Sequence, residues 1–481
     1  MTARKGQTLI EEQGVEPLAD EVRVLTPTGM LGAGISPRHV EYGIARGAHA
    51  IALDSGSTDS GPAYLAKAVS KTNREAIKRD LEVLMAAAHQ ARIPILIGSC
   101  GTAGTDAGVD WTADIAVDVA RSLGVAPRIA LLYSEQSPAV IMARNAAGKI
   151  RPLPPAGPLC DTTITACEHI VALMGPEPYM AALEQGADIV LGGRTTDTAV
   201  LAATPLLRGA GAGPAWHASK VAECGGLCTV NPRAGGVLMR VGAEGFDMEP
   251  LSPDNQCSPE SVSAHMLYEN SDPFRLIEPG GILDVEDACY RQLDSRVTRV
   301  TGSRWRPTPY TMKLEGAGGG AFQTIMLIGI EDPEVLANLD ALHDGMHATL
   351  THRIQRTFRE EAGDFDLSLR IYGWNGVSGR PVPAGAPPPR EVGVLLVVTA
   401  ATQELADRMA KACNPLFFHF PLRPGIELPS YAFPFTPAEI SRGQVFEFLL
   451  NHVVEVADGH ELVRTAWIDL ARRPAGAPAH G

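Results

Sequence analysis

The stretch GADIVLGGRTTDT, residues 186–198, reads as a buried strand that ends in an ionic, hydroxyl-rich turn. Its apolar run Ile189–Leu191 is strand-like, Gly192-Gly193 permit a tight turn, and helical spacing resumes at Ala199. Open α/β sheets bind their ligands at the carboxyl ends of the strands. The turn therefore predicts a site for a substrate carboxylate or phosphate, with contacts from Gly193, Arg194, Thr195 and Thr196.

Asp197 closes this turn and is a candidate for exchanging a proton with the substrate. A purely structural interpretation stays open at the same residues. In that case Thr196 or Asp197 caps the following helix, and Arg194 pairs with a surface carboxylate.

The first half of the chain alternates apolar strands with helical patterns. Strands are predicted at 22–25, 50–53, 95–97, 129–132 and 189–191. Helices are predicted at 37–46, 74–90, 111–123, 139–147, 177–185 and 199–207. Strands that are apolar throughout and separated by helices imply a parallel sheet with helices on both faces, so the predicted fold class is α/β.

Two further turns follow the first predicted strands. Residues 28–34 contain GxxGxG, which is not the dinucleotide fingerprint GxGxxG, but their backbone N–H groups can face an anion at the helix that Ser36-Pro37 starts. Residues 54–62 offer two carboxylates and several hydroxyls, with Asp54 and Ser55 as candidate substrate contacts or ligands of a hard cation. A solvated loop is the structural alternative for this second segment.

A third turn places Ser99 and Cys100 between a strand and a helix. Ser99 is a candidate substrate contact. A thiol near a helix N-terminus can act as a nucleophile or an acid, and His169 is the nearest histidine in a plausible helix to serve as its base. The alternative is that Cys100 is an inert buried thiol.

Glu223 and Cys224 end a helical pattern just before Gly225. A carboxylate at a helix C-terminus is unfavourable against the helix dipole, and a raised pKa suited to proton transfer would explain its place there. Exposure of Glu223 to solvent is the alternative. Glu223 is therefore a second candidate proton carrier, and Cys224 a candidate assisting group.

Composition limits the class of protein. The 481 residues suffice for two or three domains, 45% of them are hydrophobic, and the formal net charge is −14 without any basic run. Nucleic acid and anionic membranes are therefore not expected as partners, whereas a small molecule is. The first residues show no apolar signal segment and no stretch has membrane-spanning length, so a cytoplasmic protein is expected.

The eight cysteines include no CxxC pair, which argues against a disulfide framework or a zinc ribbon. The spacing Cys224-x-x-x-Cys228 suits two metal ligands, but no second pair accompanies it, so no metal-ligating residues are predicted. No cofactor is firmly implied, although a divalent metal stays open.

Four segments together resemble a known family: GADIVLGGRTTDTA at 186–199, HASKVAECGG at 217–226, ENSDP at 269–273 and PGGILD at 279–284. They are similar to the acyclic terpene utilisation family named for AtuA, over most of residues 20 to 450. Gly193, Arg194, Asp197, Glu223, Cys224 and Gly225 match the family pattern. The early turn, SGFWGD in the family, and the third turn, NAGG, differ here.

The resemblance implies a ferredoxin-like α+β domain at the end of the chain. The expected organisation is an N-terminal extension (1–20), an α/β domain (21–360), a ferredoxin-like domain (361–460) and a tail (461–481), disordered from Arg472. In the second half, strands are predicted at 324–330, 365–372 and 391–399, and helices at 333–342, 346–357 and 403–413.

The resemblance and the turns together lead to one main hypothesis and two alternatives. The main hypothesis is a catabolic enzyme that hydrates, dehydrates or isomerises a branched carboxylate or acyl-CoA by acid/base chemistry, with Arg194 holding the anion. The alternatives are a hydrolase with a Cys nucleophile and a non-catalytic ligand-binding or scaffold subunit. Self-association of the chain is also expected.

Overall fold

The chain folds into two compact units in the computed structural model, which describes residues 18–471 except 384, 424 and 426. Unit 1 comprises the described residues up to 318 and from 448 onward, and unit 2 comprises those from 319 to 447. Most of the predicted N-terminal extension, and the tail from Arg472, lie outside the described residues. The predicted domain boundaries at 20, 360 and 460 stay a prediction.

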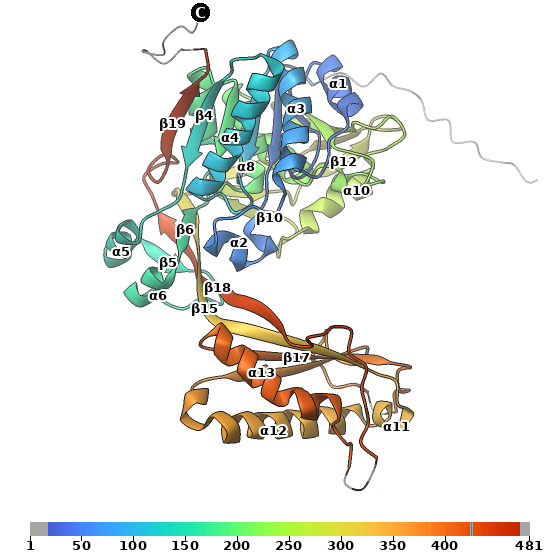
Figure 1. The fold of residues 1–481 in the computed structure, drawn as a ribbon. Coiled ribbons are helices and arrows are strands. Elements are labelled where there is room, and N and C mark those ends of the chain that lie inside the picture. Colours follow the sequence, from blue (N-terminus) through green and yellow to red (C-terminus); the bar gives the residue numbers. More distant parts are fainter. Residues whose placement is uncertain (1–17, 384, 424, 426, 472–481) are drawn as a thin grey trace, which may run out of the picture. The chain divides into compact units, whose positions relative to one another are not determined.

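A ten-stranded sheet forms the centre of unit 1 (Figure 1). From edge to edge its strands are β12 (Cys289–Gln292), β13 (Thr298–Thr301), β9 (Gly245–Pro250), β8 (Val237–Val241), β1 (Val22–Thr26), β2 (Ala50–Asp54), β3 (Ile95–Gly98), β7 (Ile189–Gly192), β4 (Arg128–Tyr133) and β19 (Arg464–Asp469). The five strands from β1 to β4 pair in parallel, and the strands on either side of them pair antiparallel. The α/β class is confirmed, but the sheet is mixed, not wholly parallel.

Helices cover both faces of this sheet. Alternate strand residues such as Leu25 and Ile51 pack against α1 (Pro37–Ala45), α3 (Arg74–Ala91) and α4 (Asp106–Leu123). The intervening residues, such as Val24 and Ala52, pack against α7 (Glu177–Glu184), α8 (Asp197–Leu207) and α9 (Ala212–Ala222). The predicted helices on both faces are confirmed, because each parallel strand is apolar on its two sides.

Several element boundaries differ from the sequence prediction. The helices predicted at 333–342 and 346–357 are a short α11 (Pro333–Leu336) and one long α12 (Leu339–Phe358), and the helix predicted at 403–413 continues to Phe418. Helix α4 begins at Asp106 and not at Trp111, because the Thr105 hydroxyl caps it by accepting from the N–H of Gly108 at 3.2 Å. Helix α9 begins at Ala212, inside the Gly-Ala tract 209–214 that reads as a flexible connection. In the case of α9, whose residues are almost all buried, tertiary packing overrides the weak local preference.

Shorter elements complete unit 1. They are η1 (Thr58–Ser60), α2 (Pro62–Ala66), α5 (Pro138–Ala146), β5 (Ile150–Pro152), α6 (Asp161–Ala166), β6 (His169–Ala172), η2 (Gly225–Cys228), α10 (Pro259–Ala264), η3 (His265–Leu267), β10 (Arg275–Glu278), β11 (Gly281–Asp284) and β14 (Arg304–Pro307). Strands β10, β11 and β14 form a small antiparallel sheet.

Unit 2 is built on an antiparallel sheet with strand order β16-β17-β15-β18. Its elements are, in chain order, β15 (Thr311–Ile330), α11 (Pro333–Leu336), α12 (Leu339–Phe358), η4 (Arg359–Ala362), β16 (Asp366–Tyr372), β17 (Val392–Ala400), α13 (Gln403–Phe418) and β18 (Ile440–Glu455). Alternate residues of β15, β16 and β17 share one hydrophobic core with α12 and α13 (Figure 1). The predicted α+β character of this region is confirmed.

Strands β15 and β18 begin or end in unit 1. The first residues of β15 pair with β6, and the last residues of β18 pair with β5. The Gly-rich run 316–320 lies inside β15. Within the described chain, no helix has both the length and the apolar content needed to cross a membrane.

Candidate functional site

A pocket of about 290 Å³ lies where β1, β2 and β7 end. Its lining comes from the turns after these strands, the end of α9 and the segment after η3: Gly29, Met30, Asp54, Gly56, Ser57, Asp59, Ser60, Lys71, Asp197, Glu223, Cys224, Tyr268 and Glu269. Five carboxyl groups and one ammonium group line it, which makes it strongly acidic. The predicted turns thus converge at the carboxyl ends of the parallel strands.

Larger pockets occur elsewhere in the described chain. One of about 870 Å³ lies at the opposite ends of the strands and contains a single carboxylate, Asp188. Volume alone does not identify a reactive site, whereas convergent ionisable groups with perturbed pKa values do. The smaller acidic pocket is therefore the candidate site.

The turn between β7 and α8 supplies the structural frame of the site. The Thr196 hydroxyl caps α8 by accepting from the N–H of Ala199 at 3.3 Å. The Thr195 hydroxyl donates to the carbonyl of Gly193 at 2.9 Å and lies 2.8 Å from the Tyr179 hydroxyl. Both hydroxyls have protein partners, so the structural interpretation holds for Thr196, and Asp197 is left to face the pocket.

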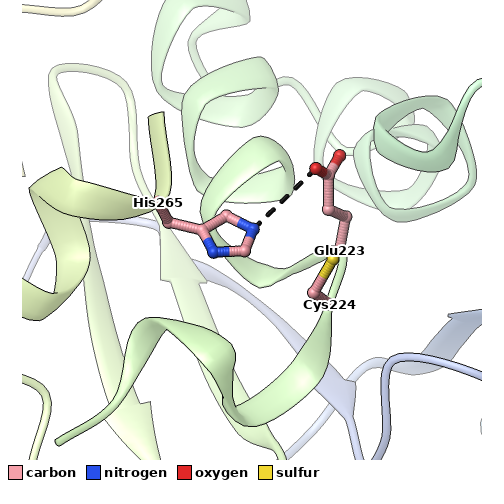
Figure 2. Close-up of side chains that lie close together, drawn as sticks. All are labelled: Glu223, Cys224 and His265. Atoms are coloured by element: carbon pink, nitrogen blue, oxygen red, sulfur yellow. Dashed lines mark ion pairs between the residues drawn. The ribbon is translucent and has the colours of Figure 1, made fainter. Parts of the chain in front are cut away.

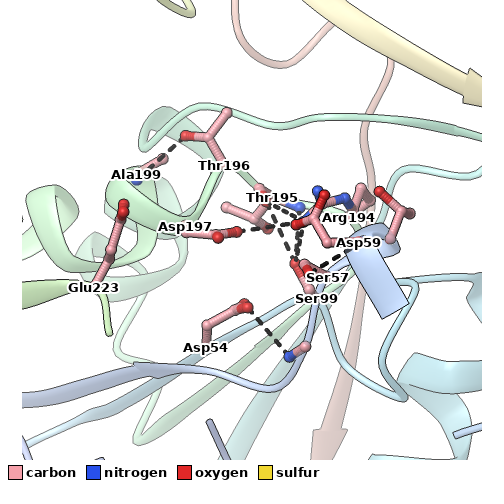
Figure 3. A network of polar contacts seen from close by, with 12 residues as sticks. Asp54, Ser57, Asp59, Ser99, Arg194, Thr195, Thr196, Asp197, Ala199 and Glu223 are labelled. Carbon is pink, nitrogen blue, oxygen red and sulfur yellow. Dashed lines mark hydrogen bonds and ion pairs between the residues drawn. The ribbon is translucent and has the colours of Figure 1, made fainter. Parts of the chain in front are cut away.

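Arg194 is buried behind Asp197 and does not line the pocket. Its Nε donates to Glu315 at 3.1 Å. Its Nη1 donates to Ser99 at 3.1 Å and to Asp197 at 3.4 Å (Figure 3). Burial disfavours the Arg194 cation, but Glu315 and Asp197 outweigh this effect and raise its pKa. Arg194 is thus held by internal carboxylates, and its role as the receptor of a substrate anion stays a prediction.

Asp54 and Asp197 are the two carboxyl groups in the pocket with perturbed ionisation. Burial raises the pKa of Asp54 to about 6, although the charge of Arg194 opposes the shift. Oδ2 of Asp54 accepts from the N–H of Gly56 at 3.1 Å, and Oδ1 is buried with no hydrogen-bond partner among the described residues. Burial and the neighbouring charge of Asp54 also raise the pKa of Asp197, whose side chain is 31% exposed toward the pocket.

The third turn is strained and mostly internal. Ser99 has a φ of +44°, and its hydroxyl donates to the carbonyl of Thr195 at 3.3 Å while it accepts from Arg194. Cys100 is fully buried in the core of unit 1, and this burial, followed by the charge of Asp54, raises its thiol pKa. The structural interpretation, an inert buried thiol, fits Cys100 better than a nucleophile.

His169 does not supply a base for that thiol. Its Nδ1 lies 2.5 Å from Glu135, and both residues line a separate pocket of about 660 Å³ with Asp106. Ser55 is buried as well, and its hydroxyl has no hydrogen-bond partner among the described residues.

The end of α9 contributes the second half of the pocket. Oε1 of buried Glu223 accepts from the Lys220 ammonium at 2.6 Å and lies 3.8 Å from Nε2 of His265 (Figure 2). Glu223 is therefore not exposed to solvent, contrary to the structural alternative. Burial and the charges of Glu223 and Asp197 raise the pKa of the Cys224 thiol.

A glycine after Cys224 is required by geometry. Gly225 has a φ of +60°, and a Cβ there would lie 2.6 Å from the backbone nitrogen of Gly29. A side chain at Gly225 would therefore push the end of α9 away from the turn after β1. This contact places Glu223 and Cys224 beside the carboxyl ends of the strands.

The anion position predicted at the first turn is already filled by the chain. Oδ2 of Asp80, on α3, accepts from the N–H groups of Gly32 at 2.7 Å and Gly34 at 3.2 Å. The turn does hold an anion at the start of α1, but this anion is an internal carboxylate.

Three residues of the site escape sequence reasoning: Glu315, His265 and Glu278. Glu315 lies inside β15, and His265 lies between two of the recognised segments with no motif of its own. Burial raises the pKa of Glu278 to about 7, although its Oε1 accepts from the Thr198 hydroxyl. In the sequence, each of these positions is marked only by a single polar residue among apolar ones.

Comparison with known families identifies one match, whose ranges begin after Asp54. Residues 63–229 and 250–445 match the family described as acyclic terpene utilisation family protein AtuA. These ranges include Arg194, Asp197, Glu223, Cys224 and His265. No curated protein and no solved structure gives a significant match. Because the match covers most of the chain, this protein belongs to the acyclic terpene utilisation family of AtuA.

Proposed function

We propose that this protein is a catabolic enzyme of acyclic terpene utilisation that moves a proton on a branched carboxylate or its acyl-CoA thioester. The observation that carries the proposal is the pair Asp54 and Asp197 in one pocket, both with raised pKa values. Two carboxyl groups that resist simultaneous ionisation provide one base and one acid near neutral pH. Family membership supports the class of substrate.

The chemistry that fits this pair is isomerisation, or hydration and its reverse. In isomerisation of an unsaturated substrate, the ionised carboxylate removes a proton from the carbon next to the carbonyl. The electron pair of that C–H bond forms a C=C bond to the carbonyl carbon, and the π pair of the carbonyl moves onto its oxygen. Return of a proton to a different carbon shifts the double bond. In dehydration, the protonated partner gives its proton to the departing hydroxyl group.

Arg194 acts in this proposal as a positioning residue. Its two hydrogen bonds to Ser99 and Asp197 fix the turn on which Asp197 stands. A hydrolase with a Cys nucleophile is not proposed, because burial raises the thiol pKa values of both Cys100 and Cys224 and so disfavours the thiolate that such a nucleophile needs.

The test is incubation with branched unsaturated and hydroxy acids and their CoA thioesters in deuterated water, read by mass and isomer composition. We expect deuterium uptake or a mass change equal to one water, and losses of at least about 100-fold in Asp197→Asn and Asp54→Asn. Asp344→Asn, at an exposed carboxylate of unit 2, serves as the control and keeps full activity. Absence of turnover with every member, with and without divalent metal, would favour a scaffold subunit.

Other finer expectations stay proposals. Unit 2 has the element order β-α-β-β-α-β with strand order β16-β17-β15-β18, which supports a ferredoxin-like domain. A cytoplasmic location, a small-molecule substrate and self-association of the chain stay proposals; the net charge of −14 without a basic run favours a small molecule over nucleic acid as the ligand.

A further inference from the structure

We propose that Glu223, Cys224 and His265 bind a divalent transition-metal ion of the Zn²⁺ class at the wall of the acidic pocket. One ligand atom from each residue, a carboxylate oxygen, Sγ and a ring nitrogen, lies within 4.8 Å of the other two. In a tetrahedral zinc site with bonds of about 2.0–2.3 Å, ligand atoms are separated by about 3.3–3.8 Å. The 3.8 Å between His265 Nε2 and Glu223 Oε1 already meets this spacing.

The burial of His265 and the lack of a partner for its Nε2 independently support a bound cation. Its side chain is 4% exposed, and Nε2 has no hydrogen-bond partner among the described residues although it points at Glu223 (Figure 2). A buried polar atom without a partner is costly because it loses its hydration and gains no compensating bond. A metal ion between the two side chains would give this nitrogen a ligand bond and remove that cost.

Glu223 is held in place for such a role. The Lys220 ammonium donates to Oε1 and, at 3.0 Å, to the carbonyl of Tyr268, so it fixes the orientation of the carboxylate. The Lys220 bond is made to Oε1, and the Glu223 side chain lines the pocket. Ligating carboxylates commonly carry such a second hydrogen bond, which orients them toward the metal.

The choice of metal class follows from the ligands. A thiolate and an imidazole favour zinc-like ions over Mg²⁺ or Ca²⁺, which prefer oxygen ligands. Three protein ligands leave the fourth tetrahedral position open, as in catalytic zinc sites. Glu223 and Cys224 both line the pocket, so that position faces it.

A bound metal ion would also offset the negative charge of the pocket. Five carboxyl groups and one ammonium group repel an anionic substrate, and the Arg194 cation is already paired with Glu315. A divalent ion would attract the carboxylate or thioester carbonyl and stabilise the negative charge that forms on its oxygen when the proton is removed. This consequence rests on the proposed function, whereas the metal site itself does not.

The experiment is titration of the metal-depleted full-length protein with Co²⁺, followed by absorption spectroscopy. We expect one equivalent to bind and to produce a thiolate-to-cobalt charge-transfer band in the near ultraviolet. The band disappears in Cys224→Ser and binding weakens at least about tenfold in His265→Asn, whereas Cys289→Ser, at an exposed cysteine, leaves both unchanged. Far-UV circular dichroism verifies that each variant is folded.

A measurement on the unmutated protein covers the case in which a variant does not fold. One equivalent of Zn²⁺ should slow the alkylation of Cys224 by iodoacetamide at least about tenfold while Cys289 reacts at its usual rate. Absence of stoichiometric Co²⁺ binding, a band that persists in Cys224→Ser, or equal alkylation rates would overturn the proposal. Metal binding without turnover of any substrate would instead remove the proposed function and leave the site.

Discussion

Replacement of Glu315 by glutamine tests whether the carboxylates behind the pocket hold the site together. Glu315 is 5% exposed and accepts from Arg194 at 3.1 Å, from Thr58 at 2.9 Å and from Lys313 at 2.7 Å. Burial opposes its ionisation, but the charges of Arg194 and Lys313 outweigh this and lower its pKa to about 2. Glu315→Gln removes the negative charge while it keeps the shape of the side chain.

The loss in the free energy of unfolding caused by Glu315→Gln can be obtained in two ways. The pKa of Glu315 lies roughly 2 units below that of an unfolded glutamate, and each unit corresponds to about 1.4 kcal/mol, so ionised Glu315 contributes about 3 kcal/mol to folding at pH 7. Breaking a buried ion pair from one side costs about 3–5 kcal/mol. We therefore expect Glu315→Gln to lower the free energy of unfolding of unit 1 by about 3 kcal/mol.

The pH dependence has a defined sign. Because the pKa is lower in the folded than in the unfolded chain, the stabilisation is complete above the unfolded pKa and is lost as the pH falls toward about 2. The difference between wild type and Glu315→Gln should shrink by about 1 kcal/mol between pH 7 and pH 4, where the unfolded glutamate is already largely protonated.

Urea unfolding followed by tryptophan fluorescence measures this difference. Four of the five tryptophans belong to unit 1, at positions 111, 216, 305 and 467. The matched control is Glu286→Gln, which breaks a pair with Arg275 at 3.3 Å whose side chains are 63% and 50% exposed, and which should cost less than about 1 kcal/mol. Equal costs for the two variants would refute the reasoning.

Three further outcomes can be measured directly. Asp54→Asn should stabilise the protein more at pH 8 than at pH 5, by about 1–2 kcal/mol in the free energy of unfolding. The reason is that burial holds the folded pKa of Asp54 at about 6, so that its ionisation above this pH opposes folding. Urea unfolding curves at both pH values check this. Hydrogen bonds with Thr162 and Thr163 lower the pKa of Cys160 to about 7. We therefore expect Cys160 to be alkylated faster at pH 7 than Cys289, which is also exposed. Peptide mass mapping over time measures both rates, and equal rates would contradict the prediction. Leu350→Ala, in the core of unit 2, should cost about 2–5 kcal/mol in the unfolding of that unit, read from Trp374; a smaller loss would mean that the core closes around the cavity.

Local sequence patterns predict the central sheet well. Strand β2 occurs at Ala50–Asp54 and helix α3 at Arg74–Ala91, within one residue of the patterns that indicate them. Buried parallel strands are apolar throughout and amphipathic helices have a clear period, so both carry a strong signal. The antiparallel strands β8 and β9 were not predicted, because their residues pair across the sheet with partners that no local period reveals.

The Gly-rich part of β15 shows a different limit. Gly316 and Gly318 read as breakers of a strand, yet they allow neighbouring segments to approach closely: a Cβ at Gly318 would lie 2.1 Å from the carbonyl oxygen of Ala166. Glycine in a strand often marks such an approach. Sequence alone does not distinguish this role from that of a loop.

Only part of the candidate site can be predicted from the sequence. Its turns follow recognisable strands, so the meeting of Asp54, Ser99 and Arg194 could be expected from the topology of a parallel sheet. Glu315 and His265, which decide the charge and the ligands of the site, come from distant segments. Their role depends on tertiary packing, which a single sequence does not encode in any local pattern.

The carboxylate of Asp80 occupies the N–H groups of the turn after β1, so it would compete there with any external anion. Any free phosphate or nucleotide that approached the N–H groups of Gly32 and Gly34 would have to displace a group tethered to the same chain. Tethering gives such a group an effective concentration on the order of millimolar or higher. An external phosphate at the start of α1 would therefore meet N–H groups that a carboxylate of the same chain already occupies.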